Sequence, residues 1–117
     1  MFKFEDLRVY QEALSFNDEI YFITKQFPKN ELFGLTNQLR RASVSITLNI
    51  AEGTSRTKKD FRHFIDLSRG SCYECIAILT IAKRRKYIEE TKFLELYNKC
   101  NIITKMLNAL KTSLREP

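Results

Sequence analysis

Three cysteines and one histidine are the side chains of this 117-residue chain best suited to hold a metal. Cys72 and Cys75 form a C-x-x-C pair, and with His63 and Cys100 they would make four zinc-type ligands. On a helix, however, His63 would lie about half a turn off the face of Cys72 and ~13 Å away along the axis. Tetrahedral zinc needs all its ligands within ~2.3 Å of one point. We therefore expect no metal site and no cofactor, with Cys75 and Cys100 as small core residues.

His63 is also the one candidate for a catalytic base. Asp60 and Asp66 stand three residues before and after it, where a carboxylate can orient an imidazole. Catalysis also needs a nucleophile and a cleft, and the sequence contains no glycine-rich phosphate loop. Ion pairing on a solvated helix surface is the commoner meaning of this spacing, so we expect a protein that is not an enzyme.

Basic side chains offer a third chemistry, the binding of polyanions. Residues 32–88 hold 11 bases against 4 acids, in a chain whose formal net charge is +6 at pH 7. Such a concentration of one sign attracts nucleic acid, although a solvated surface that only keeps a protein in solution has the same composition. No helix-turn-helix, zinc-finger or RNA-recognition motif occurs, so backbone and shape are the expected targets. The candidate nucleic-acid-binding residues are Arg40, Arg41, Arg56, Lys58, Lys59, Arg62, Lys83, Arg84, Arg85 and Lys86.

Long helices must position these residues. Only three Gly and two Pro interrupt the chain, and apolar residues recur every three or four positions, which is the spacing of one helix face. Pro28 and Gly53 end two such patterns, and Thr57 with Asp60 begins another as a helix cap. We expect helices over residues 6–27, 31–53, 57–87 and 90–114, in one domain spanning 1–117. With short connections they fold into an all-α, antiparallel up-down four-helix bundle.

In this bundle the basic residues gather at the two ends. The turn between the second and third helices carries Arg56, Lys58, Lys59 and Arg62. The end of the third helix carries Lys83, Arg84, Arg85 and Lys86, with Arg40 and Arg41 not far below.

A polar flank runs beside the apolar face of the second helix. Buried polar groups must be paired, or each costs about 1–3 kcal/mol. With a turn near Ser55, Arg41 would face Ser71, so we expect Arg40 or Arg41 to pair with Glu74 between the second and third helices. A polar pocket that binds a ligand is the alternative. The expected structural polar seam consists of Gln38, Arg41, Ser45, Asn49, Ser71 and Glu74, and the small residues Ala42, Ser45, Gly70 and Ser71 would allow close approach.

The first helix carries more apolar surface than one seam of a bundle needs. A second stripe beside its main one consists of Leu7, Tyr10, Leu14, Asn17 and Tyr21. It indicates a second interface, hence a homo-oligomer, with deep burial in its own bundle as the alternative. No stretch approaches the ~18 apolar residues that cross a bilayer, and acids stand where a signal peptide has an apolar run. We expect a cytoplasmic protein with no membrane partner.

Several runs resemble one protein family over nearly the whole chain: FEDLRVYQEA (4–13), FPKNELFGLTNQLRRASVSITLNIAEG (27–53), DF (60–61) and GSCYE (70–74). They resemble the four-helix-bundle family of bacterial 23S ribosomal RNA intervening-sequence proteins, sometimes labelled ribosomal-protein-like. The most specific pattern is Q-[LI]-x-R-[AS]-x-x-S-I-x-x-N-I-A-E-G, which residues 38–53 match. The chain departs from the family in Tyr10, where many members have Trp, and in Arg69, at a position usually apolar or small.

The resemblance implies a bundle that assembles into a ring, a pentamer. It also implies similarity to the accessory variability protein of diversity-generating retroelements, which binds nucleic acid and a reverse transcriptase. It implies no settled activity for members that stand alone. We expect a non-enzymatic oligomer that binds RNA or DNA through its basic patches. A scaffold or protein-partner-binding oligomer with no nucleic-acid role is the alternative.

Overall fold

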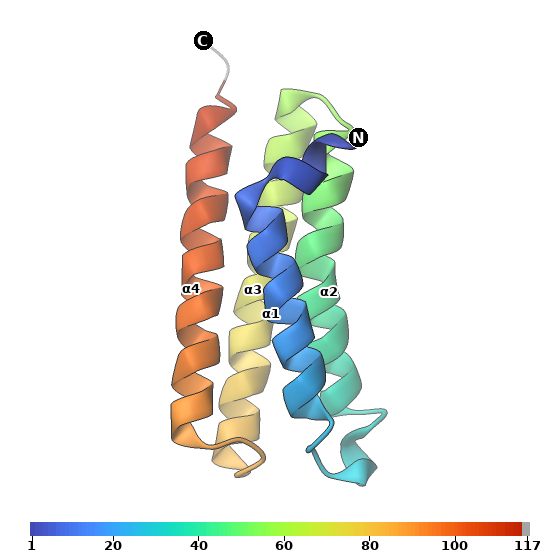
Figure 1. Cartoon of the computed structure of the whole chain (residues 1–117), viewed down its shortest axis with the longest axis vertical. Helices are drawn as coiled ribbons and strands as arrows, with labels where there is room; N and C mark the ends of the chain where they lie inside the picture. The colour runs from blue at the N-terminus through green and yellow to red at the C-terminus, as the bar shows by residue number, and fades with distance from the viewer. Residues whose placement is uncertain (116–117) are drawn as a thin grey trace.

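The computed structural model describes residues 1–115 and consists of four long helices (Figure 1). Each helix runs antiparallel to the one before it. No strand occurs among residues 1–115, so the all-α, antiparallel four-helix bundle expected from the sequence is confirmed. In the same part of the chain, every helix is too short or too polar to cross a bilayer. The elements are η1 (Lys3–Asp6), α1 (Arg8–Thr24), η2 (Lys29–Glu31), α2 (Leu35–Thr54), α3 (Lys58–Arg84) and α4 (Glu90–Ser113), where η denotes a short 3₁₀ helix.

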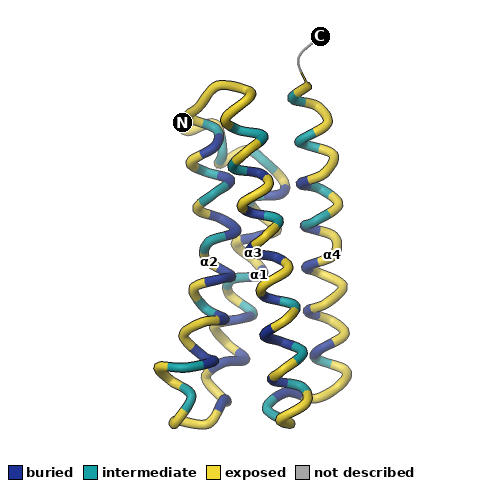
Figure 2. The backbone as a smooth tube through the Cα atoms, turned by 180° about the vertical axis from the view of Figure 1, so that it is seen from behind, coloured by how far each residue is buried: buried dark blue, intermediate teal, exposed yellow. Residues whose placement is uncertain are grey.

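Each long helix packs against two neighbours around a central core. Buried positions follow the inner side of every helix (Figure 2), as the three-four spacing of apolar residues requires. The bundle measures 49 × 22 × 21 Å, so its two ends are well separated. The largest fully buried side chains are Phe16, Ile20, Leu39, Ile46, Ile50, Ile65, Leu79, Leu96, Ile103 and Leu107.

The first helix begins at Arg8, two residues later than its apolar spacing indicated. Leu7 has an extended backbone, with φ −77° and ψ 126°, and separates η1 from α1. The ring of Phe4 packs edge-on against Tyr10, with 4.8 Å between the ring centroids. This contact holds η1 against the first turns of α1.

Small residues allow α2 and α3 to pack closely. A β-carbon at Gly53 would lie 2.5 Å from Cδ1 of Phe61, so no side chain fits there without a shift. Nearby, the hydroxyl of Ser68 donates a hydrogen bond to the carbonyl of Ile46, with 2.8 Å between the oxygens. Gly70 was expected to assist this approach, but it faces open space, with nothing within 4 Å of the position of a β-carbon.

Alanine at these two glycines should change stability in opposite directions. Gly70→Ala should raise the free energy of unfolding by about 0.5–1 kcal/mol, because alanine has the higher helix propensity and its methyl group meets nothing. Gly53→Ala has the same propensity gain, but overpacking costs about 1–3 kcal/mol, so we expect a net loss of about 1 kcal/mol. Urea denaturation at equal protein concentration measures both. A Gly53→Ala protein at least as stable as the parent would contradict the close approach of Phe61.

Part of the expected polar seam forms between α2 and α3. The hydroxyl of Ser71 donates to the hydroxyl of Ser45 at 2.9 Å. Within α2, Asn49 donates from Nδ2 to the carbonyl of Ser45, also at 2.9 Å. Ser71 therefore lies opposite Ser45 and not opposite Arg41, which displaces the two helices by about one turn from the expected register. The turn is centred on residues 55–57, slightly later than the sequence indicated.

The charged part of the expected seam does not form. Gln38, Arg41 and Glu74 are all exposed, so the expected pairing of Arg40 or Arg41 with Glu74 is wrong. The displaced register removes Arg41 from the level of Ser71. Arg40 turns to α1 instead, where its Nε donates to Oγ1 of Thr24 at 2.8 Å.

A second polar seam, which the sequence did not indicate, joins α1 to α2. The side-chain oxygen of Asn17 accepts a hydrogen bond from Ser43, and its Nδ2 donates to Oγ1 of Thr47 at 3.2 Å. Ser43 and Thr47 are buried, and Asn17 is half-buried. The second stripe of the first helix thus contains a polar cross-link to α2 as well as apolar surface.

Candidate nucleic-acid interface

The first basic group lies at the upper end of the bundle in Figure 1, around the α2–α3 turn. The hydroxyl of Thr57 accepts a hydrogen bond from the backbone N–H of Asp60 at 3.2 Å, which confirms the expected cap of α3. The cap fixes Lys58 and Lys59 in the first turn of α3, and both side chains are exposed. Arg56 is already paired with a carboxylate one helical turn earlier, at 2.8 Å. The two lysines are therefore the more available cations of this turn.

Beside this turn, the start of α3 and the end of α4 enclose a basic groove of about 270 Å³. Residues 62, 66 and 69 lie on one face of α3, and residues 108 and 111 lie on one face of α4, because each set is spaced by three or four. Arg115 follows the end of α4. The ion pair between residues 66 and 111 sets the two faces against each other. We call this surface the α3–α4 groove, and it is lined by Arg62, Arg69, Asn108, Lys111, Thr112 and Arg115.

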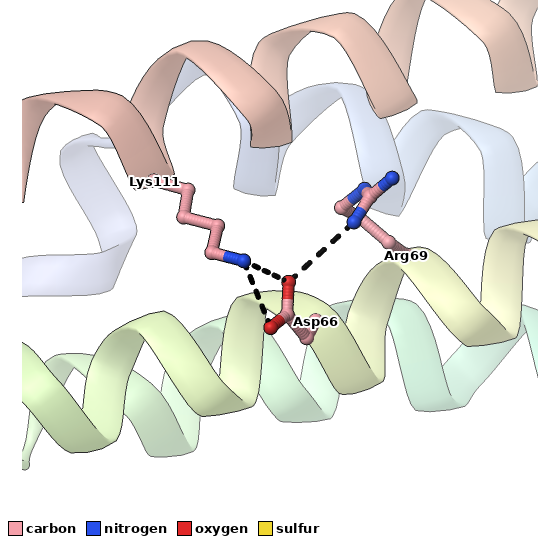
Figure 3. A network of polar contacts seen from close by, with 3 residues as sticks. All are labelled: Asp66, Arg69 and Lys111. Carbon is pink, nitrogen blue, oxygen red and sulfur yellow. Dashed lines mark hydrogen bonds and ion pairs between the residues drawn. The ribbon is translucent and has the colours of Figure 1, made fainter.

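One carboxylate, that of Asp66, pairs with two of the cations that line the α3–α4 groove, although Asp66 is not itself a lining residue. Nζ of Lys111 donates to both oxygens of Asp66, at 2.8 and 2.9 Å, and Nη1 of Arg69 approaches one of them to 3.5 Å (Figure 3). The hydrogen bond from Lys111 is the main cause that lowers the pKa of Asp66 below its ordinary value, so Asp66 is ionised at neutral pH. Among residues 1–115, the buried Nε atoms of Arg62 and Arg69 have no hydrogen-bond partner.

Arg62 is the one groove residue among the candidates derived from sequence. Arg69, Lys111 and Arg115 were missed because they stand apart in the chain from the basic groups at residues 40–41, 56–62 and 83–86. The signal that was present is spacing: Arg62 and Arg69 are seven residues apart, which is two turns of one helix face. Only the pairing of α3 with α4 brings the remaining cations to that face.

The second basic group lies at the lower end of the bundle, at the α3–α4 turn. Lys83 pairs with Glu90 across the turn at 3.8 Å. Arg85 pairs with a carboxylate of η2 at 3.1 Å. Arg84 and Lys86 are exposed, and Lys86 ends the helix with a positive φ of 64°. Acids therefore offset part of the positive charge at this end.

Glu31 ties together the two connections at the lower end. Its Oε1 accepts the backbone N–H of Leu35 at 3.2 Å, and its Oε2 accepts from the hydroxyl of Tyr87 at 2.9 Å and from Arg85 at 3.1 Å. The bond to Leu35 satisfies an otherwise free N–H at the start of α2, which explains why this helix begins there and not at residue 31. These hydrogen bonds, that of Leu35 first, lower the pKa of Glu31 below its ordinary value.

Glu31→Gln should reduce the loss of stability in acid. A carboxyl whose pKa is lower in the folded state stabilises the fold above its unfolded pKa, near 4.3, and that contribution disappears as the pH falls through the folded pKa. The thermal midpoint of the parent should therefore fall more steeply than that of Glu31→Gln between about pH 5 and about pH 3. Glu12→Gln, which changes an exposed carboxylate on α1, is the control. If the thermal midpoints of all three proteins fell equally as the pH decreased, the role given to Glu31 would be contradicted.

Arg40 and Arg41 lie in a separate groove between α1 and α2. The guanidinium carbon of Arg40 lies 4.0 Å from the ring centroid of Tyr21, a cation–π contact. The groove has a volume of about 580 Å³, and much of its wall is apolar. Arg40 and Arg41 therefore face different chemistry from the cations at the two ends. We call this surface the α1–α2 groove, and it is lined by Tyr21, Leu32, Phe33, Asn37, Arg40, Arg41, Val44, Ser45 and Leu48.

The cysteines and the histidine lie in different environments. Cys72, Cys75 and Cys100 are buried free thiols, and burial raises the pKa of Cys75 above its ordinary value. His63 is exposed, and its neighbour Asp66 is held by a lysine of α4. In the described part of the chain, no three His, Cys, Asp or Glu side chains surround a point where one metal ion would fit.

Comparison with known proteins identifies the family. The model of the family described as 23S rRNA-intervening sequence protein matches residues 5–109. The chain belongs to this family. The resemblance carried by residues 38–53 is thereby confirmed, whereas similarity to the accessory variability protein stays a prediction.

One solved structure similar to this chain is a crystal structure from Bacteroides thetaiotaomicron, of a protein of unknown function from the S23 ribosomal protein family. The two chains are 23% identical and superpose with a TM-score of 0.82, over 89% of this chain and 95% of that chain. They share the fold. A search of curated proteins found no match.

The match to the 23S rRNA-intervening sequence protein family includes all the basic residues selected from sequence, together with Arg69. It ends before Lys111 and Arg115. The α3–α4 groove therefore combines residues inside the matched part with residues that follow it.

Proposed function

We propose that this 23S rRNA-intervening sequence protein is a non-enzymatic oligomer that binds the backbone of RNA or DNA in the cytoplasm. The observation that carries the proposal is the concentration of cations at the upper end. Lys58 and Lys59 are exposed beside a groove with four further cations, Arg62, Arg69, Lys111 and Arg115. Such a surface suits a polyanion, because neutralised phosphates release their counterions.

Recognition of backbone and shape fits this surface better than recognition of bases. Reading a duplex sequence needs a helix or ribbon whose side chains reach base edges, and reading single strands needs exposed aromatic rings for stacking. The α3–α4 groove is lined by charged and small polar side chains without an aromatic ring. Contacts from Lys and Arg to phosphates position a nucleic acid without selecting its sequence.

Charge reversal at the upper end tests the proposal. Fluorescence anisotropy would measure the affinity for a labelled RNA of about 20 nucleotides and for a DNA duplex of similar length, at low salt. Lys58→Glu/Lys59→Glu should weaken binding to both by roughly tenfold or more. Lys25→Glu/Lys29→Glu makes the same charge change at exposed positions of the lower end and should cost much less. Absence of binding by the parent protein at low salt would overturn the proposal.

A scaffold or protein-binding oligomer is the second candidate function, and the α1–α2 groove favours it. Phe33 is 92% exposed and Leu48 is 62% exposed, and exposed apolar patches of this kind mark interaction sites. We propose that this face joins copies of the chain, in a ring of five as the family resemblance implies. Light scattering tests this: Phe33→Asp/Leu48→Asp should reduce the native mass, and a monomeric parent at micromolar concentration would contradict assembly. Co-purification of a specific protein, insensitive to nuclease, would favour the scaffold.

A further inference from the structure

We propose that the α3–α4 groove is a binding site for a phosphate group of a nucleic-acid backbone. This inference rests on the proposed function, and it assigns one phosphate to a defined place. The groove is separate from the α2–α3 turn, and three of its cations, Arg69, Lys111 and Arg115, were not among the residues selected from sequence.

Facing residues of α3 and α4 converge on the groove. The Asp66–Lys111 ion pair at 2.8 Å fixes the register of the antiparallel helices. Arg62 of α3 and Arg115, which follows the end of α4, line the same groove, so the groove brings like charges together. Like charges at close range repel, and an anion bound between them converts the repulsion into attraction.

The two arginines of α3 that line the groove have unused donors. The Nε atoms of Arg62 and Arg69 are buried, and neither has a hydrogen-bond partner among residues 1–115. A buried donor without an acceptor is unfavourable. The oxygens of a phosphate satisfy such donors, because a guanidinium offers two parallel N–H groups in a fork that matches them.

The contacts of Asp66 show that two cations of the groove lining, Lys111 and Arg69, bind an oxyanion and that one carboxylate leaves most of the positive charge of the lining uncompensated. Its carboxylate takes two hydrogen bonds from Lys111, but Arg69 reaches it through a single nitrogen at 3.5 Å (Figure 3). The guanidinium of Arg69 is therefore only weakly engaged. Four cations line the groove against this one carboxylate of the described residues.

The residues that line the α3–α4 groove suit a phosphate of the nucleic-acid backbone better than a base. Asn108 and Thr112 add neutral hydrogen-bonding groups, and among residues 1–115 no apolar or aromatic side chain lines the groove for a base to stack on. The volume of about 270 Å³ is several times the ~30 Å³ that one water molecule occupies in the liquid, so a phosphate fits with part of its hydration. Lys58 and Lys59 at the same end suit the neighbouring phosphates of the same strand.

Two probes and three variants test the site. The probes are inorganic phosphate, followed by ³¹P NMR and by thermal shift against chloride at equal ionic strength, and a labelled RNA of about 20 nucleotides. Arg62→Gln/Arg69→Gln removes two charges while keeping a polar side chain at each position. Lys25→Gln/Lys29→Gln removes two charges from the lower end as the matched control. Asp66→Asn removes the competing carboxylate and keeps every cation.

The arginine pair variant and Asp66→Asn are expected to change the affinity for phosphate in opposite directions. Arg62→Gln/Arg69→Gln should abolish the response to phosphate, weaken RNA binding at least about tenfold and reduce the salt slope by about one or two. The control should stay within about twofold of the parent for both probes. Asp66→Asn should bind phosphate roughly three- to tenfold more tightly, because the carboxylate no longer repels it and Lys111 is released. A variant that only damaged the fold would not gain affinity.

The test distinguishes failure of the phosphate site from failure of the proposed function. RNA binding by the parent, with the arginine pair variant matching the control, overturns the site and leaves the proposed function standing. If the arginine pair variant does not fold in a circular dichroism melt, Asp66→Asn decides, and unchanged phosphate affinity overturns the site. A parent that binds no RNA overturns both proposals, and a response to inorganic phosphate alone would then identify a small-anion site.

Discussion

Binding of the parent protein to a single-stranded RNA should weaken roughly fiftyfold when the salt rises from about 50 mM to about 200 mM. Each phosphate neutralised on a single strand contributes about −0.7 to the slope of log affinity against log salt. The upper end offers Lys58, Lys59 and the cations of the α3–α4 groove, and we take about four of these to contact phosphates at once. Four contacts give a slope of about −2.8, so a fourfold rise in salt concentration weakens binding by roughly fiftyfold.

Charge reversal shows which end of the bundle produces the salt dependence of RNA binding. Lys58→Glu/Lys59→Glu should make the plot shallower by about 1.4, because two of the contacts are lost. Arg84→Glu/Lys86→Glu at the lower end should change the slope less, since acids already offset part of the charge there through Glu31 and Glu90. Anisotropy titrations at four or more salt concentrations measure each slope. An affinity of the parent that is independent of salt would contradict electrostatic recognition of the backbone.

The helices were predictable because burial of one face dictates a spacing. Phe16 and Ile20 on α1 and Leu39 and Ile46 on α2 were placed on inward stripes from sequence, and all four have no exposed surface. Each stripe needs only its own helix to be recognised. The cap at Thr57 was predictable for the same reason, because the capping hydroxyl and the backbone N–H that donates to it lie three residues apart.

The register between helices was not predictable in the same way. An apolar stripe with alternating steps of three and four repeats itself after one turn, so a slip of one turn leaves apolar faces matched. Only the turn length and the polar pairs distinguish the alternatives. The pairing of Ser71 with Ser45 was therefore displaced from the expected level, and the expected partnership of Arg41 with Glu74 failed with it.

The same dependence on the register between helices explains which residues of the candidate site could be predicted from sequence. Lys58 and Lys59 form a cluster that is visible along the chain, and they were selected from sequence. The α3–α4 groove depends on residues more than 40 positions apart, such as Asp66 and Lys111, whose hydrogen bond spans 45 residues. Knowledge of helix ranges does not align these positions, because the alignment depends on the length of the α3–α4 turn. Glu31 is similar, since it meets Tyr87 across 56 residues.

Asn17→Leu should lower the free energy of unfolding by about 2–4 kcal/mol, more than either glycine substitution. The change removes the acceptor of the Ser43 hydroxyl and the donor to Thr47. Ser43 is 1% exposed and Thr47 is 4% exposed, so water cannot easily replace the lost partner. An unsatisfied buried hydroxyl costs about 1–3 kcal/mol. Urea denaturation at fixed protein concentration measures the loss.

A triple variant separates unsatisfied hydroxyls from lost packing. Ser43→Ala/Thr47→Val, added to Asn17→Leu, removes the Ser43 hydroxyl that has lost its acceptor and the Thr47 hydroxyl, which still donates to the carbonyl of Val44 but has lost its donor. Replacing all the partners of a polar network by apolar groups of similar shape is often nearly neutral. We therefore expect the triple variant to regain most of the stability lost by Asn17→Leu. A triple variant as unstable as the single one would instead attribute the loss to packing of α1. Recovery would also show that the seam between α1 and α2 is not needed for stability, and that its remaining physical role is to fix the register that apolar spacing leaves open.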